Sequence, residues 1–582
     1  MKLREESNKR SPWENIKLWL ILNLVLCIVV EMIGSLNGVE RLSYLITHCP
    51  VFMMDYIVLL ILTSPALFFS KMPFVFNLFA VFAMGLAHTS RILLTIRGLP
   101  LTWGDFYIAK EGLSIADKYL SGPLVFIIIC LTVLAIILLY YSYGIKCVER
   151  YTKRSVLFIF IITSMNSMIV SEAQVQTKVS EVIAEDLQVD SSEGGALYTF
   201  VTSYKGNKEA VAQNYTPEAI EAIRREFKEQ PFIESETKKP NILFVQTESF
   251  IDPYSLKGIT YSEDPIPCMR PYLGTPWSGK MEVPDVNTAR TEFEVLTGIR
   301  IKDLFEYQVP YTSDVLDGRP IESVAHILKQ KGYHTTAIHN NEGSFYSRDK
   351  VYGLLGFERF IALEDMTGVT YSKNWPKDEV LKDYIVKTLQ GTEGRDFIYT
   401  VTVGTHSSYD TEYNTSESVI KVRGLASPEA IAQVQDYVDR LHETDAMLGE
   451  LMRTLRASVE PTILVVYGDH IPGLEALTMD TRYEKNKVPY LVMSNYVMQG
   501  DMPKETTSYR LYTEVLNQVG IQGGILQAAH NSLWRDADYF EKLDLVAYDT
   551  LIGSNHLNGN KPSYKMEPLK RGLPKKGNNE KK

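Results

Sequence analysis

The chain has 582 residues, 45% of them hydrophobic, with 60 Lys and Arg against 70 Asp and Glu. This length predicts several structural units, and the apolar and aromatic content excludes a disordered or collagen-like chain. The mean hydropathy of -0.08 would be ordinary for a soluble protein. The average conceals an uneven distribution, because long apolar runs gather in the N-terminal part.

Five apolar stretches lie within residues 1–170, at 18–33, 51–69, 74–96, 124–141 and 156–170. A membrane-spanning helix needs about 20 predominantly apolar residues, a length that the second, third and fourth stretches approach or exceed. The first stretch is shorter and contains Glu31. Basic residues ahead of it also fit a signal peptide, but four stretches follow without a convincing cleavage site. We therefore expect residues 1–170 to form a membrane domain with about five transmembrane helices.

Basic residues near these stretches predict the orientation of the chain. They precede the first stretch, lie between the second and third at Lys71, and lie between the fourth and fifth at Arg150 and Arg154. With five spans, all three groups fall on one side of the membrane, which should be the cytoplasmic side. The N-terminus is then inside, and the chain after Ser171 is extracellular.

The net charge of -10 is divided unequally, because residues 1–170 are net basic and the remainder is net acidic. An acidic outer domain gives no support to nucleic acid as a partner. Of the five Cys, only Cys268 follows residue 170. The outer part should therefore be stable without an intrachain disulfide.

The outer part is predicted to be a linker followed by one large α/β domain. Residues 171–239 form a helical linker, in which Thr216, Pro217 and Glu218 have the pattern of a helix start. Residues 240–560 alternate short apolar strands with helices, which favours a mostly parallel sheet with helices on both faces. The predicted strands are 241–246, 334–338, 397–403, 462–467 and 488–493, and the clearest helices are 321–331 and 428–455. Residues 561–582 form a basic tail that we expect to be disordered.

Polar residues follow the predicted strands at the edge where ligands gather in such sheets. Glu248, His406 and the pair Asp469 and His470 all occupy such positions. Each of them alone is more often a helix cap or a hydrogen-bonded surface group. Glu248, Asp469 and His470 together supply two carboxylates and one imidazole, which suits Mn²⁺, with Zn²⁺ and Mg²⁺ as alternatives. These residues by themselves provide no nucleophile.

Five motifs occur in a fixed order along the outer part. They are TES at 247–249, NTARTEF at 287–293, FYSRD at 345–349, GTH at 404–406 and GDH at 468–470. Together with the N-terminal spans and the external loop of residues 98–105, they make the chain resemble the lipoteichoic acid synthase family. Those proteins are phosphoglycerol transferases of the alkaline phosphatase/sulfatase superfamily. The resemblance implies an extracellular domain of that fold.

The resemblance also implies roles for individual residues. Thr288 matches the family's nucleophile, since it stands four residues before Glu292 and Phe293, although Thr291 lies close by. The implied metal ligands are Glu248, Thr288, Asp469 and His470. The implied contacts to glycerol phosphate are His339, Tyr346, Arg348 and His406. Of these, His406 also fits a role as a proton shuttle.

The implied reaction has two steps. Thr288 attacks the phosphodiester of phosphatidylglycerol and releases diacylglycerol, and an acceptor hydroxyl then takes the glycerol phosphate. The acceptor is a glycolipid, a polyglycerol-phosphate chain such as lipoteichoic acid, or a polysaccharide. Three positions depart from the family pattern, namely Asn287 for Lys, Asn341 for an acidic residue and Tyr346 for Trp. These departures point to a relative that decorates another glycan or polymer.

Other functions need to be weighed. A phosphoethanolamine transferase usually has a disulfide-rich outer domain, which a single outer Cys does not support. A sulfatase requires a C/S-x-P-x-R signature, whereas Cys268 is followed by Met269, Arg270 and Pro271. A two-metal phosphatase would need more Asp and His ligands than these motifs provide, whereas a phosphodiesterase of the same superfamily stays an alternative. A non-catalytic, membrane-anchored binding or regulatory protein is the remaining alternative, and the intact set of implied ligands argues against it.

Overall fold

The computed structural model describes most of the chain. The described residues are 12–35, 38, 41, 49–97, 100–106, 109, 122–145, 196–203, 208–227, 239–474 and 484–574, except for 285–286, 302–303, 305–307, 314, 317, 485, 560–563 and 567. The chain divides into two compact units. One comprises Met1–Phe106 with Gly112–Lys205, and the other Tyr107–Glu111 with Gly206–Lys582.

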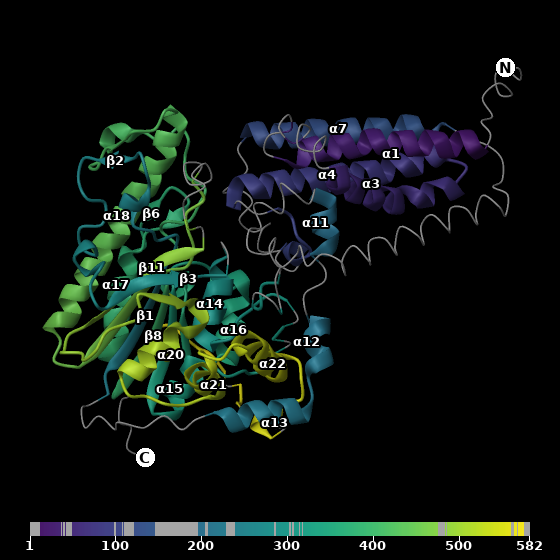
Figure 1. The fold of residues 1–582 in the computed structure, drawn as a ribbon. Helices are drawn as coiled ribbons and strands as arrows, with labels where there is room; N and C mark the ends of the chain where they lie inside the picture. The colour runs from purple at the N-terminus through teal and green to yellow at the C-terminus, as the bar shows by residue number, and fades with distance from the viewer. Residues whose placement is uncertain are drawn as a thin grey trace, which may run out of the picture. The chain divides into compact units, whose positions relative to one another are not determined.

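The N-terminal unit is helical (Figure 1). Its main helices are α1 (Pro12–Gly34), α3 (Cys49–Thr63), α4 (Met72–Arg97), α7 (Gly122–Tyr143) and the short α11 (Ala196–Thr202). Within the described residues, three segments are long and apolar enough to cross a membrane, at Glu14–Gly34, Met72–Leu94 and Val125–Tyr143, and Phe52–Phe68 is a shorter apolar helix. These segments coincide with the first four predicted stretches. The fifth predicted stretch, 156–170, lies outside the described residues.

The exterior of this unit is apolar, and one charged pair lies buried in its interior. On α7, the side chains of Phe126, Leu134 and Ile136 are each at least 60% exposed. By contrast, Glu31 forms a buried ion pair with Arg41, with 2.6 Å between Oε2 and Nε. An apolar exterior and the pairing of buried charges are both expected of a protein in a lipid environment.

The C-terminal unit is built on a nine-stranded sheet with the order β12-β3-β11-β10-β1-β8-β4-β5-β13. The strands are β12 (Glu505–Thr507), β3 (Ser278–Glu282), β11 (Lys487–Ser494), β10 (Thr462–Gly468), β1 (Asn241–Thr247), β8 (Arg395–Val401), β4 (Tyr333–His339), β5 (Arg359–Ile361) and β13 (Lys570–Arg571). Neighbours from β10 to β13 are parallel, whereas β11 runs antiparallel to both β10 and β3. The predicted, mostly parallel sheet is therefore confirmed.

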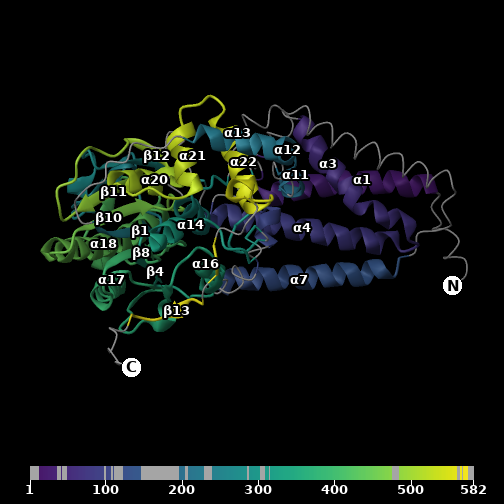
Figure 2. The same cartoon turned by 90° about the horizontal axis from the view of Figure 1, so that it is seen from below.

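Helices cover both faces of this sheet, as Figures 1 and 2 show. One face carries α13 (Pro217–Glu226), α14 (Thr288–Thr297), α15 (Val324–Gln330), α16 (Arg348–Leu354), α20 (Ser508–Gln518), α21 (Ile525–Leu533) and α22 (Tyr539–Leu551). The other carries α17 (Glu379–Gly391) and α18 (Pro428–Ala457). Successive side chains of a strand point to opposite faces, so Phe244 and Val465 enter one core while Val245 and Val466 enter the other.

The five predicted strands lie at β1, β4, β8, β10 and β11, with ends that differ by one or two residues. The predicted helix start at Thr216 is also observed, since its hydroxyl accepts a hydrogen bond from the backbone N–H of Ala219 at 3.1 Å. Strands β3, β5, β12 and β13 were not predicted. Except for β3, they are two or three residues long and have no extended apolar pattern.

Core burial at the central strands gives a testable expectation for stability. Val465 in β10 is fully buried, whereas Val459, in the turn before the same strand, is 97% exposed. Val465→Ala should destabilise the protein by about 2 kcal/mol, because it removes buried apolar surface and leaves a cavity. Val459→Ala, the same chemical change, should have an effect within about 0.5 kcal/mol. Thermal unfolding of the detergent-solubilised chain measures both, and equal shifts would contradict the core assignment.

Candidate active site

The predicted metal-ligating residues meet at the carboxyl edge of the sheet because β1 and β10 are parallel neighbours. Their register pairs Thr247 with Gly468, so the next residues along each strand, Glu248 and Asp469, emerge side by side. Ligand atoms of Glu248, Asp469 and His470 all lie within 4.8 Å of one another. Nε2 of His470 is 3.4 Å from Oε1 of Glu248 and 3.5 Å from Oδ2 of Asp469.

The hydrogen bonds of His470 and Asp469 suit a cation. Nδ1 of His470 lies 2.9 Å from the carbonyl oxygen of Ile471, which can only accept, so Nδ1 carries the proton and Nε2 presents its lone pair to the carboxylates. Oδ1 of Asp469 accepts from the backbone N–H groups of Ser249 and His470. Among the described residues, no group donates a hydrogen bond to its buried Oδ2. An orphaned carboxylate oxygen beside an imidazole lone pair fits a divalent metal ion.

Electrostatics at this site disfavour two bare carboxylates. Burial raises the pKa of Asp469 to about 7, and the negative charge of Glu248 adds to the shift. Both side chains are almost completely buried. Without a cation, the ionised pair is therefore a cost to folding, and a bound cation would offset that cost.

The Thr288 hydroxyl faces the side chains of this set, whereas the Thr291 hydroxyl faces only its backbone. Thr288 is the first residue of α14, and its hydroxyl donates to Oε2 of Glu248 at 3.2 Å and lies 3.5 Å from Nε2 of His470. The hydroxyl of Thr291 instead donates to the backbone carbonyl of Asp469 at 2.8 Å. Asn287 caps the helix, since its side-chain oxygen accepts from the backbone N–H groups of Ala289 and Arg290. Of the two threonines, only Thr288 directs its oxygen at the candidate ligands.

The two predicted substrate-binding histidines follow neighbouring strands β4 and β8. His339, the last residue of β4, is buried, and its Nδ1 lies 2.9 Å from the carbonyl oxygen of Val401. Burial holds the pKa of His339 well below its usual value, and Arg348 and His406 lower it further. Nδ1 of His406 lies 2.6 Å from the carbonyl oxygen of Ser407. In both imidazoles Nδ1 therefore bears the proton, and Nε2 is the nitrogen able to accept one.

The guanidinium of Arg348 is paired within the protein. Its Nη2 and Nε lie 2.8 and 3.1 Å from Oε2 of Glu292, and both side chains are almost completely buried. The ring of Tyr346 lies 5.2 Å from this guanidinium, and its hydroxyl accepts from Nδ2 of Asn287 at 3.4 Å. Arg348, Tyr346 and α14 are thus joined in one network. The predicted phosphate contacts of Arg348 and Tyr346 remain predictions.

Several residues that organise the site gave no sequence signal. The buried carboxylate of Asp378 accepts from the backbone N–H groups of Val403 and Gly404 and from the hydroxyl of Thr444. A Cβ on Gly404 would lie 2.7 Å from Oδ2 of Asp378, so the glycine of the GTH motif permits this approach. Asp378 directly precedes an ordinary helix, and only the tertiary structure brings it to the loop.

Trp375 and Arg440 contact His406 as well. The ring of Trp375 lies 4.4 Å from the imidazole of His406. Arg440 on α18 donates to the carbonyl oxygen of His406 at 2.9 Å and forms a buried ion pair with Asp436. The i, i+4 spacing of Asp436 and Arg440 could have indicated a helix pair, but not its contact with the loop.

Comparisons with known proteins agree with this architecture. Residues 240–521 match the family model described as Sulfatase. A relative from Rhizobium meliloti (strain 1021), named "Putative cyclic beta-1,2-glucan modification protein", is 32% identical over 250 residues. That match covers 42% of this chain and only 38% of the relative.

Two solved structures have a similar fold. The Streptococcus pyogenes phosphoglycerol transferase GacH, in complex with sn-glycerol-1-phosphate, aligns with a TM-score of 0.53 and 20% identity over 61% of this chain and 98% of that chain. The integral membrane lipooligosaccharide phosphoethanolamine transferase A (EptA) of Neisseria meningitidis aligns with a TM-score of 0.55 and 11% identity over 89% of this chain and 97% of that chain. At these identities the likeness shows the fold alone. Fold and site together give a sulfatase-type α/β domain that contains a buried candidate metal site and is preceded along the chain by candidate membrane spans.

Replacing one candidate metal ligand should raise the stability of the metal-free protein and at the same time abolish metal binding. Asp469→Asn removes a buried charge that faces Glu248, so at pH 8 the metal-free variant should unfold at a higher temperature than the metal-free wild type. Adding Mn²⁺ at a hundredfold excess over its Kd should stabilise the wild type by about 2.7 kcal/mol and leave Asp469→Asn unchanged.

Asp396→Asn is the matched control, because Asp396 is also a buried carboxylate but lies outside the metal set. This variant should retain the Mn²⁺-induced shift in the unfolding temperature. The metal assignment would be wrong if Mn²⁺ stabilised Asp469→Asn as much as it stabilises the wild type.

Proposed function

We propose that the protein is a membrane-anchored phosphoglycerol transferase that moves glycerol phosphate from phosphatidylglycerol to an acceptor in the cell envelope. The observation that carries this proposal is the placement of the Thr288 hydroxyl, which lies 3.2 Å from Glu248 and 3.5 Å from His470. A hydroxyl held against a candidate metal set is the arrangement that nucleophilic phosphotransfer requires.

In the first step, Oγ1 of Thr288 forms a bond to the phosphorus of the lipid headgroup. The bond between that phosphorus and the diacylglycerol oxygen breaks, which leaves glycerophospho-Thr288. The proton of Thr288 leaves along its hydrogen bond to Glu248. His406 in its protonated form supplies a proton to the departing diacylglycerol oxygen.

In the second step, an acceptor hydroxyl attacks the same phosphorus. Nε2 of His406, which bears the lone pair, takes the acceptor proton. The bond to Thr288 breaks, and the released Thr288 oxygen takes back its proton from Glu248. His339, kept neutral by burial, contacts the glycerol phosphate, as do Arg348 and Tyr346. The proton that His406 gave away in the first step is thereby restored, so the cycle balances.

Glu248, Thr288, Asp469 and His470 would hold one divalent cation, for which we propose Mn²⁺, with Mg²⁺ and Zn²⁺ as alternatives. When bound, this cation would lower the pKa of the Thr288 hydroxyl and neutralise charge on the phosphate. The mixed carboxylate and imidazole donors support Mn²⁺ over a pure oxygen-ligand ion.

The proposal includes the cellular arrangement. Residues 1–170 form the multi-pass membrane domain, 171–239 the linker, 240–560 the catalytic domain and 561–582 the tail, from which Lys570–Arg571 adds strand β13 to the sheet. The N-terminus is cytoplasmic and the catalytic domain is extracellular. This arrangement would hold the active site beside a donor that resides in the membrane. A glycolipid, a polyglycerol-phosphate chain and a polysaccharide are the candidate acceptors.

Loss of the Thr288 hydroxyl tests the nucleophile. With phosphatidylglycerol vesicles and Mn²⁺, Thr288→Ala should lower diacylglycerol release by on the order of a thousandfold, because it removes the hydroxyl that forms the proposed covalent intermediate. Release of radiolabelled diacylglycerol by the full-length protein measures this rate.

Thr291→Val is the comparison variant, since it removes a hydroxyl from the same helix that contacts only the backbone of Asp469. It should retain readily measurable release even if it lowers stability. Unchanged release by Thr288→Ala, or no release by the wild type, would exclude the mechanism.

A further inference from the structure

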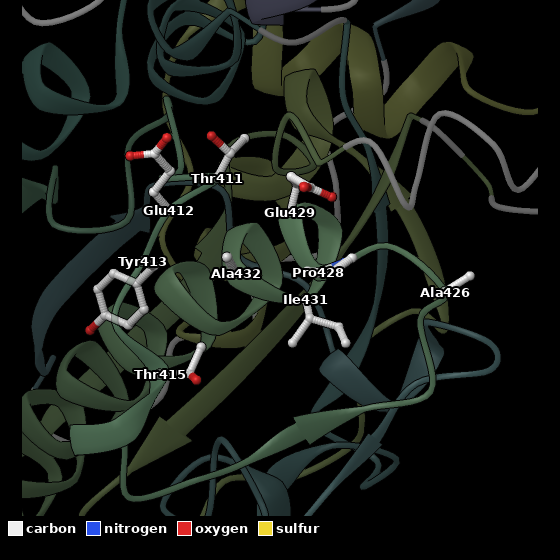
Figure 3. Close-up of a pocket in the computed structure, with 9 residues that line it drawn as sticks. All are labelled: Thr411, Glu412, Tyr413, Thr415, Ala426, Pro428, Glu429, Ile431 and Ala432. Atoms are coloured by element: carbon white, nitrogen blue, oxygen red, sulfur yellow. The ribbon is translucent and has the colours of Figure 1, made fainter.

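A pocket of about 400 Å³ lies beside the first turns of α18, outside the metal set (Figure 3). Its volume falls within the range of ordinary ligand sites. The lining residues come from the chain after the GTH motif and from the start of α18, and they are Thr411, Glu412, Tyr413, Thr415, Ala426, Pro428, Glu429, Ile431 and Ala432. Figure 3 shows Tyr413 and Thr415 on one side of the helix and Ala426 on the other.

The pocket is physically connected to His406 by two routes. Thr411 follows His406 by five residues, so the intervening chain spans at most about 17 Å. On α18, Ala432 precedes Arg440 by two turns, which is about 12 Å along the helix. Arg440 itself donates to the carbonyl oxygen of His406 at 2.9 Å. A ligand that extends from His406 along α18 would therefore reach the pocket within a few sugar units.

The aromatic ring of this pocket is held in place. The hydroxyl of Tyr413 donates to Oδ2 of Asp439 at 3.0 Å, and the ammonium of Lys373 lies 4.9 Å from the ring centroid. Lys373 is fixed in turn by Asp410, at 2.5 Å. A pre-organised aromatic side chain can contact a ligand without a large further loss of conformational entropy.

The other lining groups match a polyhydroxylated, uncharged ligand. Thr411 and Thr415 provide hydroxyls, Glu412 and Glu429 provide carboxylates that accept hydrogen bonds, and small apolar side chains complete the floor. Sugar rings present C–H faces to aromatic rings and hydroxyl donors to carboxylates. Two ammonium groups contact the described lining residues, namely Lys373 at the Tyr413 ring and Lys421 at the carbonyl oxygen of Thr415, but Asp410 and Asp436 pair with Lys373, so carboxylates outnumber cations here. A polyanionic chain such as polyglycerol phosphate would be repelled by the two carboxylates.

We propose that this pocket is a distal acceptor subsite that binds a neutral glycan segment while a hydroxyl of the same glycan lies at the catalytic centre. This inference rests on the proposed transferase function and specifies its acceptor class. Of the three candidate acceptors, it selects a neutral polysaccharide over a polyglycerol-phosphate chain. The subsite favours long acceptors, because a short one cannot occupy both places at once.

The test compares acceptors of different length and charge. The full-length protein, with phosphatidylglycerol vesicles and Mn²⁺, is given a β-1,2-linked glucose octasaccharide, the corresponding disaccharide, or a polyglycerol-phosphate oligomer. The octasaccharide should have the lowest KM. Tyr413→Ala should raise the KM for the octasaccharide between about threefold and about tenfold, which is the usual effect of losing one aromatic contact. The same substitution should change the KM for the disaccharide much less. Phe540→Ala, which removes an exposed ring from α22, is the control and should change neither KM.

Diacylglycerol release measured without any acceptor distinguishes a failure of the proposed transferase function from a failure of the glycan subsite alone. If the wild type releases none, the transferase function itself fails. If the wild type releases diacylglycerol, the glycan subsite alone is refuted by any of three results. These are a KM that does not depend on acceptor length, a length dependence that Tyr413→Ala leaves unchanged, and a lower KM for polyglycerol phosphate than for the octasaccharide.

Discussion

The parallel pairing of β1 with β10 is the constraint on which the candidate site depends. Because Thr247 and Gly468 are in register, the chain leaves both strands at one level, and two buried carboxylates come close to one imidazole. Gly468 is required there, since a Cβ would collide with the backbone carbonyl of Phe250. A shift of one residue would turn the strand's side chains to the opposite face and separate the ligands.

The close approach of the two buried carboxylates destabilises the metal-free protein, but together with the neighbouring residues it forms a candidate cation site. Burial and the charge of Glu248 raise the pKa of Asp469 to about 7, so the metal-free protein carries electrostatic strain at its centre. Ser249 relieves part of this electrostatic strain by donating two hydrogen bonds. Its backbone is left-handed, with φ of 52°, so its hydroxyl donates to Glu248 while its N–H donates to Asp469. Strain of this kind is concentrated at functional sites, where a ligand can relieve it. The fold thus forms a candidate cation site, and the Thr288 hydroxyl lies beside it.

The central strands and the candidate metal ligands could be predicted from the sequence, because both follow from patterns of neighbouring residues along the chain. An apolar run followed by a polar residue marks a strand end, which is how Glu248, Asp469 and His470 were found. The antiparallel edge formed by β3 and β11 was not predicted, since strand direction there depends on long-range pairing. Asp378 and the bond from Arg440 to His406 were missed for the same reason. The resemblance suggested a phosphate contact for Arg348, but only the structure reveals its buried pairing with Glu292.

The central claim is that Thr288 becomes covalently modified, and mass spectrometry of the protein tests it most directly. The wild type would be mixed with phosphatidylglycerol vesicles and Mn²⁺ without an acceptor, quenched in acid, and digested to isolate the peptide that contains residues 288–297. The account predicts glycerol phosphate on Thr288 within the first turnover, and none on this peptide from Thr288→Ala. Diacylglycerol release without any adduct on Thr288, or with the adduct on Thr291, would contradict it.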